Sequence, residues 1–139
     1  MHKLYQMGYE VMGEDVCSIV EDGSKEYGFK ISRLHIEDFV HLDYKFDLIM
    51  SWHVVEHLRD PRYVMHGLVN MLLPDGKILL HVPVDDVELD NGDHFHFFSD
   101  DSCRTLMEQV SKNVTSDFSH YSKTAMKSAV AATYVGTKK

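Results

Sequence analysis

One stretch in the middle of the chain constrains the fold more than any other. It opens with an apolar run, Phe46–Trp52, of the length expected for a buried parallel strand. Asp60 and Pro61 then match a helix start, as N-cap and first helical residue. A turn at 74–76 separates this helix from a second apolar run, Ile78–Val82. Strand, helix and strand in this order predict part of an open α/β sheet.

The segments on either side extend the alternation of strands and helices. In the first third of the chain the expected elements are helices at Leu4–Met7 (ended by Gly8) and Val16–Tyr27, and strands at Tyr9–Gly13 and Phe29–Ile36. Beyond the middle stretch we expect a polar loop at Val84–Phe98, a helix capped by Ser99 with the apolar stripe Cys103, Leu106, Met107 and Val110, and strands at Val114–Tyr121 and Ser128–Gly136. The short connection between these last two strands predicts an antiparallel hairpin.

The composition of the chain argues against several classes of function. The 139 residues carry a net charge of −8 without a basic stripe, which argues against nucleic acid as a partner. No apolar stretch approaches the ~18–20 residues that span a bilayer, and the N-terminus lacks a signal-peptide core, so we expect a cytoplasmic protein that does not contact a membrane. Cys17 and Cys103 lack the spacing of a metal or redox pair and are interpreted as small buried hydrophobes.

Four segments carry a resemblance to a known family: VMGED, HIEDF, FDLIMSWHVVEHLRDP and LLPDGKILLHVP. They resemble the class I S-adenosylmethionine (SAM)-dependent methyltransferases of the small-molecule type, which have a Rossmann-like open sheet. The resemblance implies SAM as cofactor. The residues that it places at the cofactor are Asp15 at the ribose with Val16 next to it, Ile36, Glu37 and Asp38 beside the adenine, and Ser51, Trp52 and His53 at the end of the fourth family strand.

The resemblance also implies a reaction. Methyl transfer to a small molecule depends mainly on alignment of the acceptor with the methyl group, and a base is needed only when the acceptor is protonated. His53 and His57 in the matching segment, and His94 further along the chain, are the candidate bases. The acceptor would enter under the loop Val84–Phe98.

The family's first strand and Gly-rich loop have no match. We therefore expect a single, incomplete methyltransferase-like domain over residues 1–139, truncated at the N-terminus as a fragment or a mis-started gene product and closed by the C-terminal hairpin. Loss of a central strand leaves open strand edges, which favour a homo-oligomer or a donated strand unless the second and fourth family strands close up directly. The alternative function is accordingly a non-catalytic methyltransferase-like protein that acts through oligomerisation or a partner chain.

Two patterns suggest metal binding but have a simpler interpretation. His53-Val-Val-Glu56-His57 matches the inverted zinc-protease motif, which requires the motif to be helical. Because it directly follows a strand, Glu56 and His57 are instead expected to hydrogen-bond the adjoining loop. His94 and His96 occupy alternate positions beside acidic residues. This pattern is compatible with a metal site or with a solvated loop. The sequence interpretation assigns no metal ligand.

Overall fold

The computed structural model describes residues 1–18, 20–84, 92–123 and 127–139. It divides the chain into two compact units, residues 1–42 and 43–139, which are described separately below. None of the helices among the described residues is both long and apolar enough to cross a membrane.

The first unit contains a small parallel sheet and short helices. Its elements are α1 (His2–Gln6), β1 (Met12–Glu14), α2 (Val20–Tyr27), β2 (Lys30–Ser32) and α3 (Ile36–Phe39). β1 pairs with β2 in parallel, with Gly13 opposite Ile31. Phe29 and Phe39 are buried in this unit. The expected end of the first helix is confirmed, because Gly8 has the left-handed φ of 89° that suits a helix terminus.

Three predicted boundaries in the first unit are wrong. The first strand lies at Met12–Glu14 rather than at Tyr9–Gly13. The helix expected from Val16 begins at Val20, because the Asp15 carboxylate accepts a hydrogen bond from the Cys17 backbone N–H (2.8 Å) and favours a turn there. The expected strand Phe29–Ile36 is only Lys30–Ser32. Glu37 and Asp38 occupy the first turn of α3, where acidic side chains stabilise a helix.

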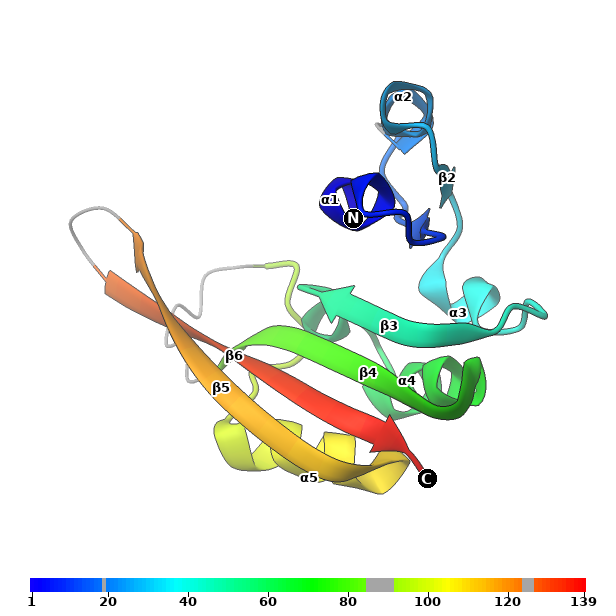
Figure 1. Ribbon diagram of the computed structural model, residues 1–139. Coiled ribbons are helices and arrows are strands. Elements are labelled where there is room, and N and C mark those ends of the chain that lie inside the picture. The colour runs from blue at the N-terminus through cyan, green and yellow to red at the C-terminus, as the bar shows by residue number, and fades with distance from the viewer. Residues whose placement is uncertain (19, 85–91, 124–126) are drawn as a thin grey trace. The chain divides into compact units, whose positions relative to one another are not determined.

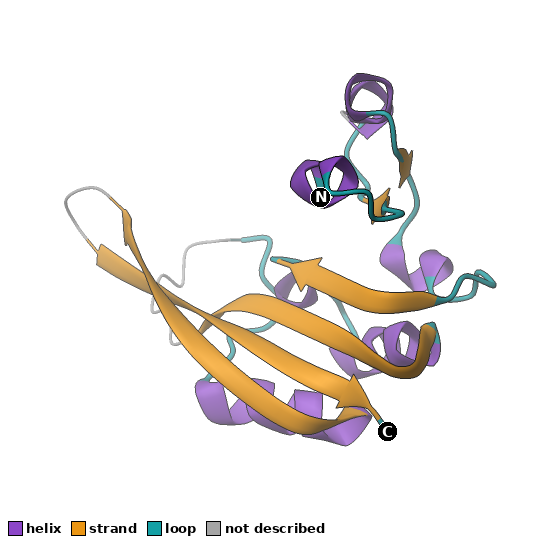
Figure 2. Ribbon diagram, in the orientation of Figure 1, coloured by secondary structure: helices purple, strands orange, loops and turns teal. Residues whose placement is uncertain are grey.

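The second unit is a four-stranded sheet with helices against one face. Its strands are β3 (Phe46–Trp52), β4 (Leu72–Val84), β5 (Ser111–Lys123) and β6 (Lys127–Lys138), in the order β3-β4-β6-β5. β3 is parallel to β4, whereas β6 is antiparallel to β4 and to β5, which confirms the predicted hairpin. The helices are η1 (Val55–His57), a 3₁₀ turn, α4 (Pro61–Asn70) and α5 (Asp100–Val110). Figures 1 and 2 show α4 and α5 on the same side of the sheet.

The core of this unit lies between the sheet and these helices. Alternate residues of β4 face it, and Ile78, Leu80 and Val82 are fully buried. The predicted apolar stripe of α5 is confirmed, with Met107 fully buried, and Met65 of α4 is fully buried as well. The opposite face of the sheet is more open, so the two sides of β3 lie in different environments.

The predicted helix starts rest on local hydrogen bonds. The Asp60 carboxylate accepts from the Tyr63 backbone N–H (3.1 Å), with Pro61 as the first residue of α4. Ser99 and Ser102 form a reciprocal capping box at the start of α5. Both helices therefore begin where the sequence predicts.

Two further predictions, the turn at 74–76 and the burial of Cys17, differ from the structure. The predicted turn at 74–76 lies inside β4, as an irregularity of register between the pairs Phe46↔Leu72 and Leu48↔Lys77, with Asp75 at a φ of 60°. Cys103 is buried as expected, but Cys17 is exposed, because it lies in the turn after β1 rather than in a helix.

One close contact in this unit yields a test of the fold. A Cβ atom at Gly136 of β6 would lie 2.0 Å from Ser111 Oγ and 2.6 Å from Ser111 Cβ. Gly136→Ala should therefore lower the free energy of unfolding by about 1–3 kcal/mol in urea denaturation. The second substitution Ser111→Gly should recover part of this loss, because it removes both contacting atoms. Gly92→Ala is the control, since no atom lies within 4 Å of its Cβ position. Additive effects of the two substitutions would contradict the packing described here.

Candidate functional site

The carboxyl ends of β3 and β4 bring an indole and an imidazole into contact. Trp52 pairs with His81 across the two parallel strands, and their rings stack with centroids 3.7 Å apart and planes at 20°. The Trp52 side chain is still 53% exposed. His81 Nδ1 is 2.8 Å from Thr133 Oγ1 of β6, which fixes the imidazole beneath the indole.

The electrostatic surroundings keep His81 uncharged at neutral pH. Burial lowers the pKa of His81 below its usual value, and neighbouring His53 lowers it further, while Glu56 acts in the opposite direction. The lowered pKa favours the neutral imidazole of His81, on which the indole of Trp52 stacks.

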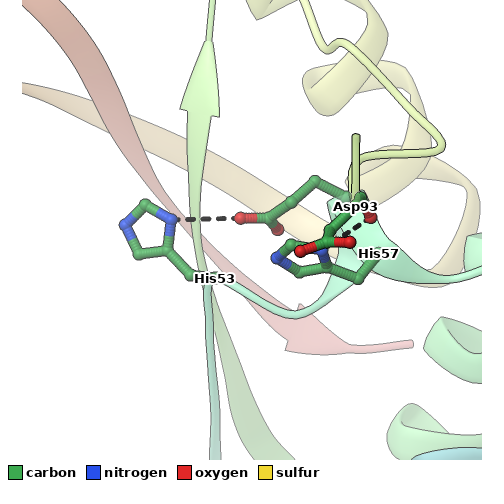
Figure 3. A network of polar contacts seen from close by, with 4 residues as sticks. His53, His57 and Asp93 are labelled. Carbon is green, nitrogen blue, oxygen red and sulfur yellow. Dashed lines mark hydrogen bonds and ion pairs between the residues drawn. The ribbon is translucent and has the colours of Figure 1, made fainter. Parts of the chain in front are cut away.

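His53 lies directly after β3 and is held by the strand and by a buried acid. Its backbone N–H donates to His81 O (3.0 Å), and its φ of 50° is uncommon for a residue other than glycine. Nδ1 lies 3.0 Å from Oε1 of Glu56, a side chain with no exposed surface (Figure 3). A carboxylate accepts hydrogen bonds, so Nδ1 carries the proton and Nε2 keeps a lone pair. In Figure 3 the second ring nitrogen of His53 points away from Glu56.

The 3₁₀ turn after β3 is joined to the loop before α5. The backbone N–H groups of Phe95 and His96 donate to Glu56 O (2.9 and 3.1 Å), and His57 Nδ1 donates to Asp93 O (2.9 Å). The sequence interpretation expected Glu56 and His57 to hydrogen-bond the loop that directly follows β3; there Glu56 bonds to His53, whereas the bonds above are to the loop before α5. This docking also places the rings of His57 and His94 with centroids 4.7 Å apart.

The helical zinc-protease interpretation is wrong. Only Val55–His57 forms a helical turn, and it is 3₁₀ in type. His53 precedes this turn and bonds to Glu56, so His53 and His57 do not share a helical face.

In the first unit, the candidate ribose acid Asp15 follows β1 and is exposed, as is Val16. Glu14, at the end of β1, was not among the site residues predicted from the sequence. Burial raises its pKa from the ordinary 4.5 to about 7, with smaller contributions from the charges of Asp15 and Glu37. The fold therefore brings Asp15 and Glu37, 22 positions apart in the sequence, into one acidic group.

The remaining candidates lie in both units. Ile36 and Glu37, in the first turn of α3, are half-buried and Asp38 is exposed. In the second unit Ser51 is buried on the helix-facing side of β3, and Trp52 is on the other side because side chains alternate along a strand. The structure thus places the candidates in two groups, one in each unit.

Sequence reasoning missed two residues of these groups, Glu14 and His81. For His81 a signal was present, since a histidine within the apolar run LLHVP is an unusual strand residue. Glu14 offered no signal, because its perturbation depends on Glu37 and on burial.

The chain matches a known protein family and is similar to several solved structures. Residues 3–116 match the family described as methyltransferase domain. No curated protein matches the sequence. The fold is similar to that of TehB from Haemophilus influenzae (TM-score 0.74, 16% identity, 98% of this chain and 52% of that one). A SAM-dependent methyltransferase from Archaeoglobus fulgidus is also similar (TM-score 0.78, 14% identity, 98% and 79%).

A third similar structure holds ligands. It is 1,6-didemethyltoxoflavin-N1-methyltransferase from Burkholderia thailandensis, with 1,6-didemethyltoxoflavin and S-adenosylhomocysteine bound (TM-score 0.75, 12% identity, 98% of this chain and 64% of that one). Similarities at this level of identity establish the fold. The chain spans about half the length of TehB and larger shares of the other two.

The raised pKa of Glu14 predicts a pH-dependent stability. Because the folded state holds this proton up to about pH 7 and the unfolded state only to about 4.5, the folded chain binds more protons between these values. Stability from this group is therefore complete below about pH 4.5 and is lost as the pH rises towards 7. Glu14→Gln mimics the protonated acid, so in urea denaturation it should gain stability relative to the unsubstituted chain on going from pH 5 to pH 8.

The exposed Glu10, which precedes β1, supplies the control. Glu10→Gln should shift stability equally at both pH values. A Glu14→Gln effect that does not change with pH would contradict the assignment.

Proposed function

Since the chain belongs to the methyltransferase-domain family, we propose that it binds SAM and methylates a small molecule. The fold is the open α/β sheet of class I SAM-dependent methyltransferases, as the sequence predicted. The observation that carries the proposal is the His53–Glu56 pair beside the Trp52–His81 stack at the carboxyl end of β3, the edge where open α/β sheets bind ligands.

The chemistry of each group suits one part of the cofactor. Asp15 is an exposed carboxylate after β1, and a carboxylate accepts hydrogen bonds from two vicinal ribose hydroxyls. Val16 is exposed beside it, and Ile36, Glu37 and Asp38 remain our candidates for the adenine. Trp52 presents a half-exposed π face suited to an adenine or a sulfonium cation. When bound, SAM supplies an activated methyl group on sulfur.

The same edge of the sheet offers a base for a protonated acceptor. His53 donates Nδ1–H to the buried Glu56 carboxylate, so its Nε2 can take a proton from an acceptor O–H or N–H. The imidazolium that forms is then stabilised by the adjacent negative charge. His57 also keeps an Nε2 lone pair, but its Nδ1–H donates to the neutral Asp93 carbonyl. A carbonyl stabilises an imidazolium less than a carboxylate does, so we favour His53 as the base.

A small-molecule acceptor is supported by the similarity to the toxoflavin methyltransferase, whose structure holds a small heteroaromatic compound. Entry beneath the loop Val84–Phe98 stays a prediction, and residues 85–91 of that loop lie outside the described residues. A single domain over residues 1–139 is supported by the family match, which spans both units. A cytoplasmic location also stays a prediction.

A second function, association through β3, is favoured by a separate observation. Among the described residues, β3 is hydrogen-bonded to β4 alone and is the edge of its sheet. Its outward face is apolar, with Leu48 45%, Met50 43% and Trp52 53% exposed. A strand edge with an apolar face favours pairing with a second chain. A non-catalytic protein that acts through oligomerisation would use this edge.

Cofactor binding can be measured with the chain's own fluorophore. Trp52 is the single tryptophan, so titration with S-adenosylhomocysteine should change its emission, and isothermal titration should give the same Kd. Asp15→Ala should weaken binding about tenfold or more, because charged hydrogen bonds to the ribose contribute roughly 1.5–3 kcal/mol. Asp22→Ala, an exposed acid on α2, should leave Kd unchanged. Equal affinity of Asp15→Ala and the unsubstituted chain would refute the ribose assignment.

The molar mass from light scattering tests association. If β3 pairs between copies, the chain should be an oligomer, and Met50→Lys should shift it to monomer by placing a charge on the apolar face. Asp47→Lys adds a lysine to the same strand at an exposed polar position and should leave the mass unchanged. A monomer at all concentrations would rule out the association function.

A further inference from the structure

We propose that Glu56, His57 and His94 bind a divalent transition-metal ion, with Zn²⁺ the best fit to their chemistry. One ligand atom from each residue lies within 4.8 Å of the other two. The three belong to the turn after β3 and to the loop before α5, segments 36 residues or more apart along the chain. The proposal goes beyond methyl transfer and replaces the sequence interpretation, which assigned no metal ligand.

The backbone holds the two segments together without help from a metal. Glu56 O accepts from the N–H groups of Phe95 and His96, and Asp93 O accepts from His57 Nδ1. His94 lies between these contacts, so its backbone is held on both sides. Figure 3 shows Asp93 directly beside the His57 ring.

The hydrogen bond of His57 prepares its other nitrogen as a ligand. A carbonyl oxygen has no proton to give, so Nδ1 carries the hydrogen in the bond to Asp93 O. Nε2 of the neutral ring then bears a lone pair. A metal-bound histidine typically donates its second N–H to a carbonyl or carboxylate in this way, which fixes the tautomer and the ring orientation.

Glu56 supplies the independent sign that a ligand belongs here. The side chain is fully buried, Oε1 bonds to His53, and Oε2 is buried without a hydrogen-bond partner among the residues that the structure describes. An unsatisfied buried carboxylate oxygen is costly, roughly 1–3 kcal/mol or more. A metal ion beside it would remove that cost and neutralise the charge.

The donor set selects the class of metal. Two imidazoles and one carboxylate are typical ligands of Zn²⁺ and of other first-row divalent ions, whereas Ca²⁺ and Mg²⁺ prefer oxygen ligands alone. Ligand atoms of a tetrahedral zinc site are roughly 3.4 Å apart, so the cluster must contract by about 1 Å. Side-chain rotation of the exposed His57 and half-buried His94 allows this. Three protein ligands leave a fourth position open for water or for an acceptor atom.

Metal titration of the purified full-length chain tests the proposal. After chelator treatment, Zn²⁺ alone should bind with one high-affinity site in competition with a metal indicator. His94→Ala and His57→Ala should each weaken that site about tenfold or more, because each removes one of only three protein ligands. His66→Ala, an exposed histidine on α4, should have no effect and controls for surface binding.

A second readout separates this site from folding defects and from the cofactor site. Co²⁺ in the same site should give visible absorption of a low-symmetry complex, lost in His94→Ala while far-UV circular dichroism is retained. Binding of S-adenosylhomocysteine is measured separately, so its failure would leave the metal result standing. Zinc binding that is absent, or that is unchanged in both His94→Ala and His57→Ala, would overturn the proposal.

Discussion

The burial of Glu56 is the constraint on which the rest of the site depends. Its backbone carbonyl receives two N–H groups from the loop before α5, and its side chain bonds to His53 at the end of β3. A carboxylate without exposed surface is tolerated only when it is paired. Loop, turn and strand end are therefore held together by one residue, and both candidate functions of the histidines around it follow from that.

The elements that could be predicted from sequence are those with local causes. β3 is a mostly apolar run, and the starts of α4 and α5 are set by Asp60 and Ser99 through bonds spanning three residues. The predictions failed where short strands depend on a partner, as in β1 and β2, which pair over only three residues. The turn at 74–76 has the right chemistry but lies inside β4, because pairing to β3 resumes beyond it.

For the candidate site, too, some features could be predicted from the sequence and others could not. The residues at the end of β3 could be placed by resemblance, since they follow a recognisable strand. The stack of Trp52 on His81 and the approach of His94 to His57 could not, because they depend on strand register and on loop docking across long sequence separations. Of the two metal-like patterns visible in the sequence, one paired His94 with His96 and the other paired His53 with His57. The fold separates their roles and joins His57 to His94 instead.

Glu56 makes the proposed base and the proposed metal site interdependent. One carboxylate oxygen accepts from His53, and the other is the unsatisfied atom that a metal would satisfy. A cation bound there would draw on the charge that would otherwise stabilise a His53 imidazolium. A metal would compensate by polarising an acceptor atom at its open position. The proposed base and the proposed metal ion would thus be alternative ways to deprotonate an acceptor at the same edge of the sheet, and occupancy of the metal site would decide between them.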